Sequence, residues 1–278
     1  MTVVAFDKTK PAKNTQKPIE DAANTPDAEQ TSPKTTHFGF SRVLFHEKTE
    51  KVREVFDSVV NRYDLMNDLM SFGLHRFWKY TTIELARIRP GQRVLDIAAG
   101  TGDLTQQIAH RLGCKGELWV TDINANMLNL ARTRLFNAGI HDPLVYIQAD
   151  AEQLPFPENY FDCITIGFGL RNVTNQENAL KAMHQCLKVG GQLLILEFSK
   201  PQSSILKDIY DRYSFSIIPT LGEMITGDRE SYQYLVESIR MHPDQENLKN
   251  MLLQAGFAQC TIHNFCGGVV ALHRATKL

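Results

Sequence analysis

The sequence has few cysteines, and none is spaced to bind a metal or to build a disulfide framework. Its five cysteines are odd in number and show no Cys-x-x-Cys pair. The nine histidines show no metal-ligand spacing either. These absences argue against a bound metal and favour a reducing, cytoplasmic location.

Long apolar runs and excess charge are also missing. No stretch approaches the roughly 18 uncharged apolar residues of a membrane span, and the N-terminus has no apolar signal core. We therefore expect any membrane contact to be peripheral, at the inner face. The formal net charge is -1 and the isoelectric point is about 6.8, so nucleic acid is not an expected partner.

The first 35 residues contain almost no large apolar side chain after Phe6. They are rich in Lys, Thr, Pro, Asp and Ala, and burial cannot offset the entropy cost of ordering such a segment. We expect residues 1–35 to be a disordered extension. The rest, residues 36–278, predicts a single domain with an N-terminal helical cap over 36–90 and an inserted helical lid over about 202–242.

The middle of the chain alternates between strand and helix patterns. Strands are predicted near 93–98, 118–122, 145–149, 161–168 and 192–198, and helices near 103–112, 125–138 and 174–188. Such alternation indicates a parallel sheet with helices on both faces. Helices are predicted again near 203–217 and 243–255, and two strands near 257–264 and 268–274. Joined at Gly267-Gly268, these two strands form a terminal antiparallel hairpin, which completes a doubly wound, seven-stranded α/β sheet.

A loop of small residues follows the first of these strands. Its order is Asp96-x-Ala98-x-Gly100-x-Gly102, and a second apolar run ends in Asp122. This pattern places an adenosine ribose at the edge of a parallel sheet. The third glycine that admits a pyrophosphate in dinucleotide sites is missing, and Asp96 and Asp103 would repel phosphates. The acids suit the sulfonium and ammonium of S-adenosylmethionine, so we expect a class I, Rossmann-like methyltransferase.

Each of these residues has a structural alternative. Gly100 and Gly102 would also serve a tight turn alone, Asp122 would also cap the following helix, and Asp150 would also be a solvated strand end. We favour a cofactor site in which Asp122 accepts hydrogen bonds from the ribose hydroxyls. Asp150 and Ala151 would then lie beside adenine.

Five further segments make the assignment more specific. They are Thr36–Phe40, Tyr63–Gly73, Phe168–Val173, Leu196–Pro201 and Glu237–Pro243. With them, residues from about 36 to 278 resemble the ubiquinone/menaquinone biosynthesis C-methyltransferase family, whose members methylate a ring carbon of a prenylated quinol. The resemblance leaves open a benzoquinol or a naphthoquinol acceptor.

The resemblance also implies cofactor contacts at Thr101, Asp122, Asp150 and Ala151. Where the family usually has Ser, this chain has Gly167, so the contact there would come from the backbone alone. We expect a serine introduced at that position to be tolerated.

The chemistry requires an electron-rich ring carbon. A quinol hydroxyl has a pKa of about 10, so forming its phenolate near pH 7 costs roughly 4 kcal/mol. Arg171 follows the fourth strand and is our candidate cation for that oxygen, with Asn172 as a second donor. The proton acceptor is left open between water, Asp64 and His242. The structural alternative is that Arg171 only pairs with a nearby carboxylate.

Further residues are candidates for binding the quinol and its prenyl tail. The segment Tyr63–Gly73 is rich in Asn, Asp, Met and aromatic residues, so we expect it to cover the ligand site. Tyr63, Met66, Asn67, Tyr210 and His242 are our candidate substrate contacts, although Met66, Met70, Phe72 and Trp78 fit a packed core at least as well. The apolar segment 205–225 would hold the prenyl tail or pack on the sheet.

Two other functional classes compete with a methyltransferase. A nicotinamide-dependent oxidoreductase also uses a glycine loop, but the missing third glycine and Asp103 argue against it. A non-catalytic cofactor-binding subunit of a quinone-synthesis assembly would keep Asp122 without needing Arg171 and Asn172. Since all three residues are present, we favour an enzyme, either as a homodimer or within such an assembly.

Overall fold

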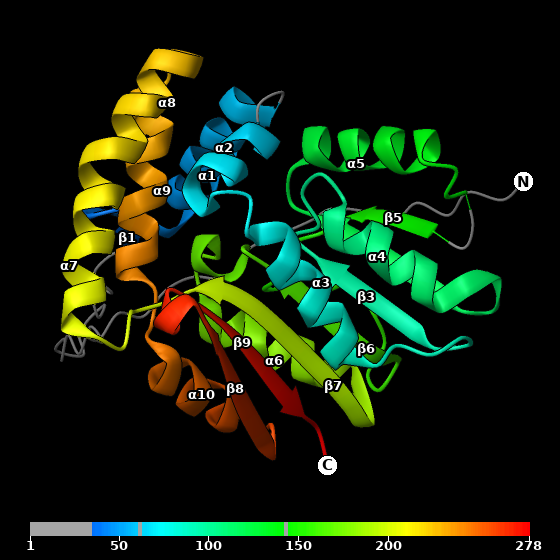
Figure 1. Ribbon diagram of the computed structural model, residues 1–278. Coiled ribbons are helices and arrows are strands. Elements are labelled where there is room, and N and C mark those ends of the chain that lie inside the picture. Colours follow the sequence, from blue (N-terminus) through cyan, green and yellow to red (C-terminus); the bar gives the residue numbers. More distant parts are fainter. Residues whose placement is uncertain (1–34, 61–62, 142–143) are drawn as a thin grey trace, which may run out of the picture. The chain divides into compact units, whose positions relative to one another are not determined.

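A seven-stranded sheet forms the centre of the part of the chain that the computed structural model describes, which is residues 35–60, 63–141 and 144–278. The strand order is β5-β4-β3-β6-β7-β9-β8 (Figure 1). The strands are β3 (Arg93–Ile97), β4 (Glu117–Asp122), β5 (Leu144–Gln148), β6 (Phe161–Gly167), β7 (Leu187–Phe198), β8 (Gln259–Phe265) and β9 (Val270–Thr276). Strands β3 to β7 run parallel, and β9 runs antiparallel to β7 and β8. The predicted doubly wound sheet with its terminal hairpin is confirmed.

Helices cover both faces of this sheet. They are α1 (Phe45–Val59), α2 (Tyr63–Ser71), α3 (His75–Ala86), α4 (Asp103–Leu112), α5 (Ala125–Asn137), α6 (Gln176–Cys186), α7 (Ser204–Arg212), α8 (Ile218–Thr226), α9 (Arg229–Met241) and α10 (Gln245–Gln254). In β3, Val94 belongs to the core cluster that includes α3 and α4, and Leu95 belongs to the cluster that includes α6 and α10. Alternate side chains of a strand point to opposite faces of the sheet, and helices cover both faces. The side chains on both faces are therefore buried, which is why these strands are continuous apolar runs in the sequence.

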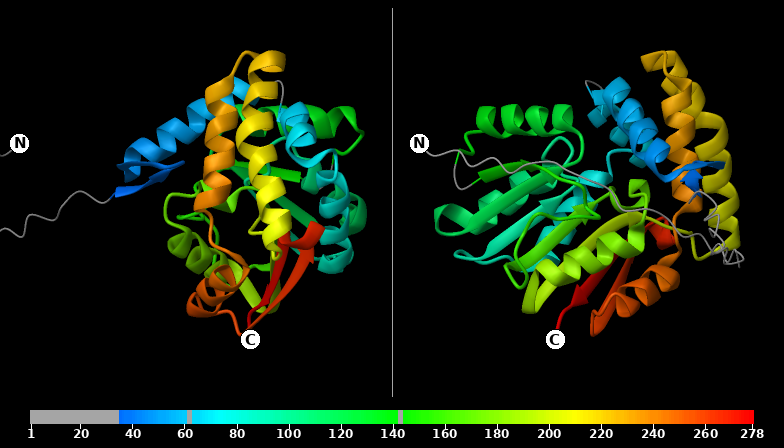
Figure 2. Two further views of the ribbon diagram at one scale, coloured as in Figure 1. Left: turned by 60° about the vertical axis from the view of Figure 1, so that its left-hand side comes forward. Right: turned by 180° about the vertical axis from the view of Figure 1, so that it is seen from behind.

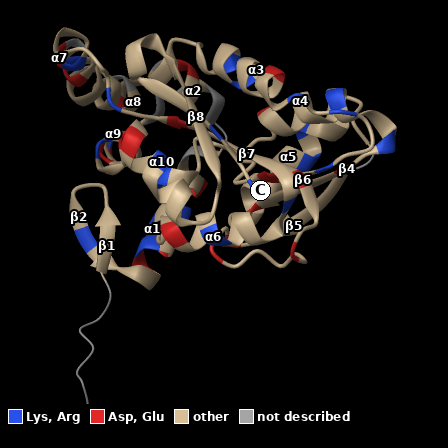
Figure 3. Ribbon diagram, turned by 90° about the horizontal axis from the view of Figure 1, so that it is seen from below, with Lys and Arg blue, Asp and Glu red and all other residues tan. Residues whose placement is uncertain are grey.

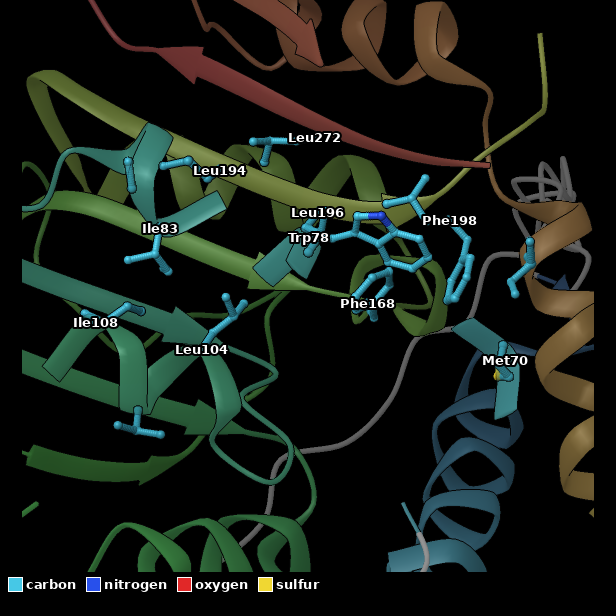
Figure 4. Close-up of a cluster of buried hydrophobic side chains, with 14 of the residues drawn as sticks. Met70, Trp78, Ile83, Leu104, Ile108, Phe168, Leu194, Leu196, Phe198 and Leu272 are labelled. Atoms are coloured by element: carbon cyan, nitrogen blue, oxygen red, sulfur yellow. The ribbon is translucent and has the colours of Figure 1, made fainter. Parts of the chain in front are cut away.

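Aromatic side chains join α3 to the carboxyl ends of β6 and β7. The ring centroid of Trp78 lies 6.3 Å from that of Phe168 and 6.4 Å from that of Phe198 (Figure 4). Trp78 and Met70 are buried in this core, as the core interpretation of those residues predicted, whereas Phe72 is 74% exposed. The cluster fixes α3 beside the edge of the sheet where a ligand is expected.

The helices between β7 and β8 differ from the prediction. Instead of one helix near 203–217, α7 passes through a π-helical turn, Tyr213–Ile217, into α8. A separate helix, α9, then begins after Asp228, whose side chain accepts a hydrogen bond from the backbone N–H of Ser231. Figure 2 shows α8 and α9 side by side. The prediction failed here because an uninterrupted apolar pattern does not reveal a π-turn.

A small hairpin precedes α1, where the sequence predicted only helices. Strand β1 (Thr35–Phe38) pairs antiparallel with β2 (Ser41–Leu44) around Gly39, whose φ is +57°. Phe38 stacks on Tyr234 of α9 with ring centroids 4.2 Å apart. Strands of four residues are too short for a period of two to stand out, so tertiary packing decides this element. The predicted disorder of residues 1–35 lies almost wholly outside the described residues.

Two helices begin later than the sequence predicted. Helix α6, expected from about residue 174, begins at Gln176, and the side chain of its N-cap Asn175 accepts a hydrogen bond from the Asn178 N–H. Pro243 precedes α10, whose N-cap is Asp244. These differences move helix boundaries by one or two residues without changing the topology.

Two features bear on possible partners. Among the residues that the structure describes, every helix is too short or too polar to cross a membrane. Lys and Arg are interspersed with Asp and Glu along the helices in the view of Figure 3. This mixture agrees with the near-zero net charge of the sequence and offers a polyanion no extended basic face in that view.

Candidate active site

The loop after β3 approaches α5 closely. Gly102, at the N-cap of α4, has a φ of +87°, and a Cβ atom there would lie 3.2 Å from Leu135 and 3.4 Å from Ala131. Glycine is therefore required both for the backbone conformation and for the packing of α4 against α5. The loop is held in place at Gly100 by the end of the neighbouring strand.

Asp122, the last residue of β4, makes that connection. Its Oδ2 accepts a hydrogen bond from the Gly100 N–H at 2.9 Å, and its Oδ1 accepts one from the Asn124 N–H at 2.9 Å. Burial raises the pKa of Asp122, and the backbone donors oppose the shift. The helix-capping role considered for Asp122 belongs instead to Asn124, whose side chain accepts from the N–H groups of Asn126 and Met127. The Asp122 carboxyl group is thus placed at a pocket rather than on the helix.

This pocket, called the larger pocket below because it exceeds the cavity with which it shares Ala98, lies between the carboxyl ends of the strands and α1. It encloses about 810 Å³ of space, part of it open to solvent. The lining comprises Gly100, Asp122, Ile123, Met127, Asp150 and Ala151 on the sheet side, Thr49, Val52, Arg53 and Phe56 of α1, and Phe168, Gly169, Asn172, Val173 and Thr174 after β6, among others. Helix α1 is held over the pocket because Asp57 accepts hydrogen bonds from the side chains of Asn124 and Asn126, at 2.8 and 2.9 Å.

A smaller cavity of about 280 Å³, part of it open to solvent, lies beside the larger pocket, and Ala98 lines both. Its lining includes Lys79, Asp96, Thr101 and Gly167. Asp96 is fully buried and accepts hydrogen bonds from the hydroxyls of Thr105 and Thr165, at 2.6 and 2.7 Å. Burial raises the pKa of Asp96 to about 6. The predicted cofactor residues are therefore divided between two adjoining spaces.

Gly167 has less room than the sequence implied. A Cβ atom at this position would lie 2.5 Å from Cδ1 of Leu104, in the wall of the smaller cavity. A serine there requires the terminal methyl group of Leu104 to shift, so its tolerance depends on how far that side chain can move.

Arg171 is buried in an ion pair. Its Nη1 lies 2.7 Å from Oε1 of Glu197, and its guanidinium lies 5.6 Å from the ring centroid of Phe198. The structure thus contains the carboxylate partner that the structural alternative required. Within the described residues, Asn172 lines the larger pocket and Arg171 lines a separate space behind it.

That separate space, the rear cavity, is bounded by the hairpin, α1, α9 and the start of α6, and its volume is about 950 Å³, part of it open to solvent. His242 lies here rather than at the larger pocket. Burial, followed by the charge of Arg171, lowers the pKa of His242 to about 3. Such a weak base is a poor proton acceptor near neutral pH.

Lys48 is a feature that sequence reasoning missed. It is buried, and its Nζ donates a hydrogen bond to the carbonyl of Val173 at 3.0 Å. Burial lowers the pKa of Lys48 to about 8, against the opposing effect of Glu152. A single lysine in an amphipathic helix reads as part of the solvated face, so the pattern carried no signal for this contact. Lys48 holds the segment after β6 against α1.

The other predicted substrate contacts lie on α2 and α7. The side chains of Tyr63, Asp64 and Met66 lie outside what the structure describes. Asn67 is half-buried on α2, and its carbonyl accepts a hydrogen bond from Ser71. Tyr210 packs against the core in α7, where burial raises its pKa to about 12, and its ring lies 5.6 Å from the Arg240 guanidinium.

Comparison with known proteins is specific at the level of family. Residues 44–277 match the model of the ubiE/COQ5 methyltransferase family. The chain is 58% identical over 243 residues to the ubiquinone/menaquinone biosynthesis C-methyltransferase UbiE of Pseudomonas paraeruginosa, covering 87% of this chain and 95% of that protein. Identity to the protein of that name from Teredinibacter turnerae is also 58%, with coverage of 87% and 98%.

Solved structures resemble the chain in fold. A SAM-dependent methyltransferase from Thermotoga maritima has a TM-score of 0.56 at 18% identity, covering 81% of this chain and 99% of that one. One from Aquifex aeolicus has a TM-score of 0.55 at 16% identity, covering 74% and 92%. At these identities the likeness concerns the fold alone.

Proposed function

The chain belongs to the ubiE/COQ5 methyltransferase family, and from that premise we propose that it transfers a methyl group from S-adenosylmethionine to a ring carbon of a prenylated quinol. The observation that carries this proposal is the position of Asp122. Its carboxyl group is held by the backbone N–H groups of Gly100 and Asn124 in the lining of the larger pocket. The match covers nearly the whole length of curated relatives that are named as C-methyltransferases of ubiquinone and menaquinone biosynthesis.

The residues around the larger pocket fit the cofactor. A carboxylate has about four acceptor sites, so Asp122 keeps acceptor capacity for a ribose hydroxyl besides its backbone donors. Ile123, Met127 and Ala151 offer apolar contacts for adenine. The charged lining consists of Asp122, Asp150, Glu152 and Arg53. An acidic excess of this kind favours a cationic sulfonium over a phosphate.

The bound cofactor would supply an electrophilic methyl group, and the protein must orient the acceptor carbon about 3–3.5 Å from it. Asn172 is a polar side chain after β6 that lines the pocket, and its Oδ1 accepts a hydrogen bond from the Tyr234 hydroxyl at 3.0 Å. That hydrogen bond fixes the orientation of the amide and leaves its N–H groups as donors. We assign these donors to a quinol oxygen.

We revise the role of Arg171 to that of a positioning residue. Its charge is balanced by Glu197, and the pair holds the short 3₁₀ turn Leu170–Asn172 against β7. A guanidinium whose charge is balanced by a carboxylate stabilises a developing phenolate less than an unpaired guanidinium would. With His242 in the rear cavity, water or Asp64 remains as the acceptor of the quinol proton.

The substrate's lipid tail suggests contact with a membrane surface. Leu74, the N-cap of α3, and Phe77 and Tyr80 within that helix recur at a spacing of three and are 43%, 58% and 51% exposed. Phe72, beside them in the chain, stacks on Tyr213 after α7 at 4.8 Å. Apolar side chains on one exposed face are what a protein needs to dip into a lipid interface. Phe77→Ser should weaken flotation with vesicles of zwitterionic and anionic lipid, and leave methylation of a short-tailed quinol unchanged.

The direct test is turnover of a demethylated, prenylated quinol with S-adenosylmethionine under anaerobic conditions. Product should form with the quinol and not with the oxidised quinone, because only the reduced ring is nucleophilic enough. A strain lacking the protein should accumulate demethylated quinone. Tight cofactor binding without turnover of either a benzoquinol or a naphthoquinol would instead indicate a non-catalytic subunit.

A further inference from the structure

The rear cavity is lined mostly by polar side chains. Three of them, Lys48, Arg171 and His242, are almost fully buried, at 5%, 6% and 3% exposure. Each carries at least one N–H group that can donate a hydrogen bond. Burying such a donor costs free energy unless an acceptor pairs with it. The acceptors that these three side chains already have therefore indicate what else the cavity can hold.

Two of the three side chains have a buried nitrogen atom without a partner. Nη1 of Arg171 pairs with Glu197, but Nε of Arg171 has no hydrogen-bond partner within the described residues. Nδ1 of His242 lies 3.5 Å from Nε2 of Gln176, whereas Nε2 of His242 has no partner in the same part of the chain. Gln176 Nε2 also donates to the carbonyl of Leu170 at 3.1 Å, so it is a donor and His242 Nδ1 accepts. The proton of neutral His242 then lies on Nε2, which is an unused donor.

Lys48 adds a positive charge to the same cavity. Its Nζ donates a hydrogen bond to the carbonyl of Val173, and an ammonium group has three donors. Burial lowers the pKa of Lys48 to about 8, so most of this amine is still protonated at pH 7. The charge of Glu152 acts on Lys48, but Glu152 lines the larger pocket and is absent from the lining of the rear cavity. Lys48 therefore offers the rear cavity both charge and spare donors.

The surroundings of His242 are positively charged. After burial, the causes that lower its pKa are all cations, namely Arg171, His273, Lys200 and Lys48. Among the described residues that line the cavity, Glu177 is the only acid, and it is exposed in the first turn of α6. That wall also carries the N-terminus of α6, where the backbone N–H groups give a partial positive charge. The cavity is thus suited to an anion.

We propose that the rear cavity binds a phosphate group, which accepts hydrogen bonds from Lys48 Nζ, Arg171 Nε and His242 Nε2. These donors come from α1, from the turn after β6 and from the residue after α9. A tetrahedral oxyanion has oxygens in several directions, so it can reach donors on separate walls. A carboxylate is matched best by the paired N–H groups of a free guanidinium, and Nη1 of Arg171 is already occupied by Glu197.

This site would be independent of whatever the larger pocket binds. It would tie α1 to the turn Leu170–Asn172, and so stabilise the folded protein when occupied. Inorganic phosphate and a phosphate monoester both present the proposed group, and the opening of the cavity to solvent leaves room for the rest of an ester. The competing interpretation is that water alone fills the cavity and satisfies the spare donors.

Calorimetry on the full-length protein distinguishes these interpretations. Inorganic phosphate and glycerol 3-phosphate, the soluble part of a phospholipid head group, are titrated at pH 7 with potassium chloride holding the ionic strength constant. We expect a dissociation constant of about 1 mM or lower and a rise in the melting temperature with phosphate. Stronger binding of glycerol 3-phosphate would identify an ester as the natural form, and binding of inorganic phosphate alone would identify the free ion. A protein that binds neither, with no rise in melting temperature, would overturn the proposal in favour of water.

Variants then assign the donors. Lys48→Met should weaken phosphate binding by about tenfold to a hundredfold, the range for a hydrogen bond to a charged group, and Lys48→Arg should recover part of the loss. His242→Phe should weaken it by about threefold to tenfold, which tests the site again should Lys48→Met fail to fold. Lys181→Met removes a charge from an exposed position on α6 outside the lining and should leave the affinity unchanged. Equal weakening by Lys181→Met and Lys48→Met, or unchanged affinity in both Lys48→Met and His242→Phe, would overturn the site.

Discussion

The hydroxyl of Tyr234 donates a hydrogen bond of 3.0 Å to Oδ1 of Asn172, which joins α9 to the turn after β6. Asn172 lines the larger pocket, and Tyr234 lines the rear cavity. The bond fixes which end of the Asn172 amide faces the proposed acceptor. Phe38 supports Tyr234 from its other side through ring stacking.

Removing that hydroxyl should therefore affect the reaction more than the cofactor. We expect Tyr234→Phe to lower kcat by about twofold to tenfold, the equivalent of one neutral hydrogen bond, with the cofactor dissociation constant unchanged. Steady-state turnover assays measure kcat, and calorimetry on the same preparation measures the cofactor dissociation constant. Tyr146→Phe, on the edge strand β5, is the control. A variant that loses cofactor affinity and keeps kcat would contradict this role for Asn172.

Asp122→Ala tests the cofactor site. Loss of the ribose contacts should weaken binding of S-adenosylmethionine by about 2–4 kcal/mol. Two backbone donors, Gly100 N–H and Asn124 N–H, also lose their acceptor, so the free energy of unfolding should fall by about 1–3 kcal/mol. Asp162→Asn, which disturbs a carboxylate that accepts from the Arg93 N–H at the other end of the sheet, should alter stability alone. Unchanged cofactor affinity in Asp122→Ala would reject the ribose assignment.

Gly167→Ser tests the packing of the smaller cavity. With Leu104 Cδ1 2.5 Å from the new Cβ, overpacking should lower the free energy of unfolding by about 1–3 kcal/mol. The double variant Gly167→Ser with Leu104→Val should recover most of that loss, because valine lacks the crowded terminal atom. Thermal unfolding of the single and double variants measures the coupling. Full stability of Gly167→Ser alone would restore the sequence-based expectation.

The sequence predicted the strands along the chain well, because the buried parallel strands are continuous apolar runs separated by helical patterns. It also predicted that Asp122 ends a strand beside the loop of Gly100. It could not foresee that Lys48 and Lys79 are buried, since a lysine in an amphipathic helix reads as exposed. It left the partner of Arg171 open, because Glu197 is 26 residues away and only the sheet brings them together.

Arg171 and Glu197 form a buried pair whose members should be coupled. Arg171→Gln leaves the Glu197 carboxylate without its cation, which should cost about 3–5 kcal/mol of stability. Adding Glu197→Gln removes the uncompensated charge, so the double variant should regain much of the stability and, with the turn restored, part of kcat. Chemical unfolding and turnover of Arg171→Gln, Glu197→Gln and the double variant complete a double-mutant cycle. A double variant that is stable and binds cofactor, yet is inactive, would give the charge of Arg171 a direct role in the reaction.

The raised pKa of Asp96 links cofactor binding to pH. Because its pKa is about 6 in the folded protein against 3.8 ordinarily, the folded state holds this proton more tightly than the unfolded chain does. The group therefore opposes folding above about pH 6, and that cost disappears as the pH falls toward 3.8. Lys79 of α3 and Asp122 of β4 are the charged groups that act on it.

The sequence assigns the acidic residues of the loop, Asp96 among them, to the cationic groups of the cofactor, and Asp96 must be ionised to pair with its ammonium. Affinity for S-adenosylhomocysteine should thus be level above pH 6 and fall below it, by at most about tenfold per pH unit, whereas affinity for 5′-methylthioadenosine should stay level. His75 lies near Lys79 and also has a pKa that burial lowers from 6.5, so His75→Gln is the control and should keep the same profile. Asp96→Asn should flatten it. A profile that persists in Asp96→Asn and vanishes in His75→Gln would assign the titration to the histidine and remove Asp96 from the ammonium site.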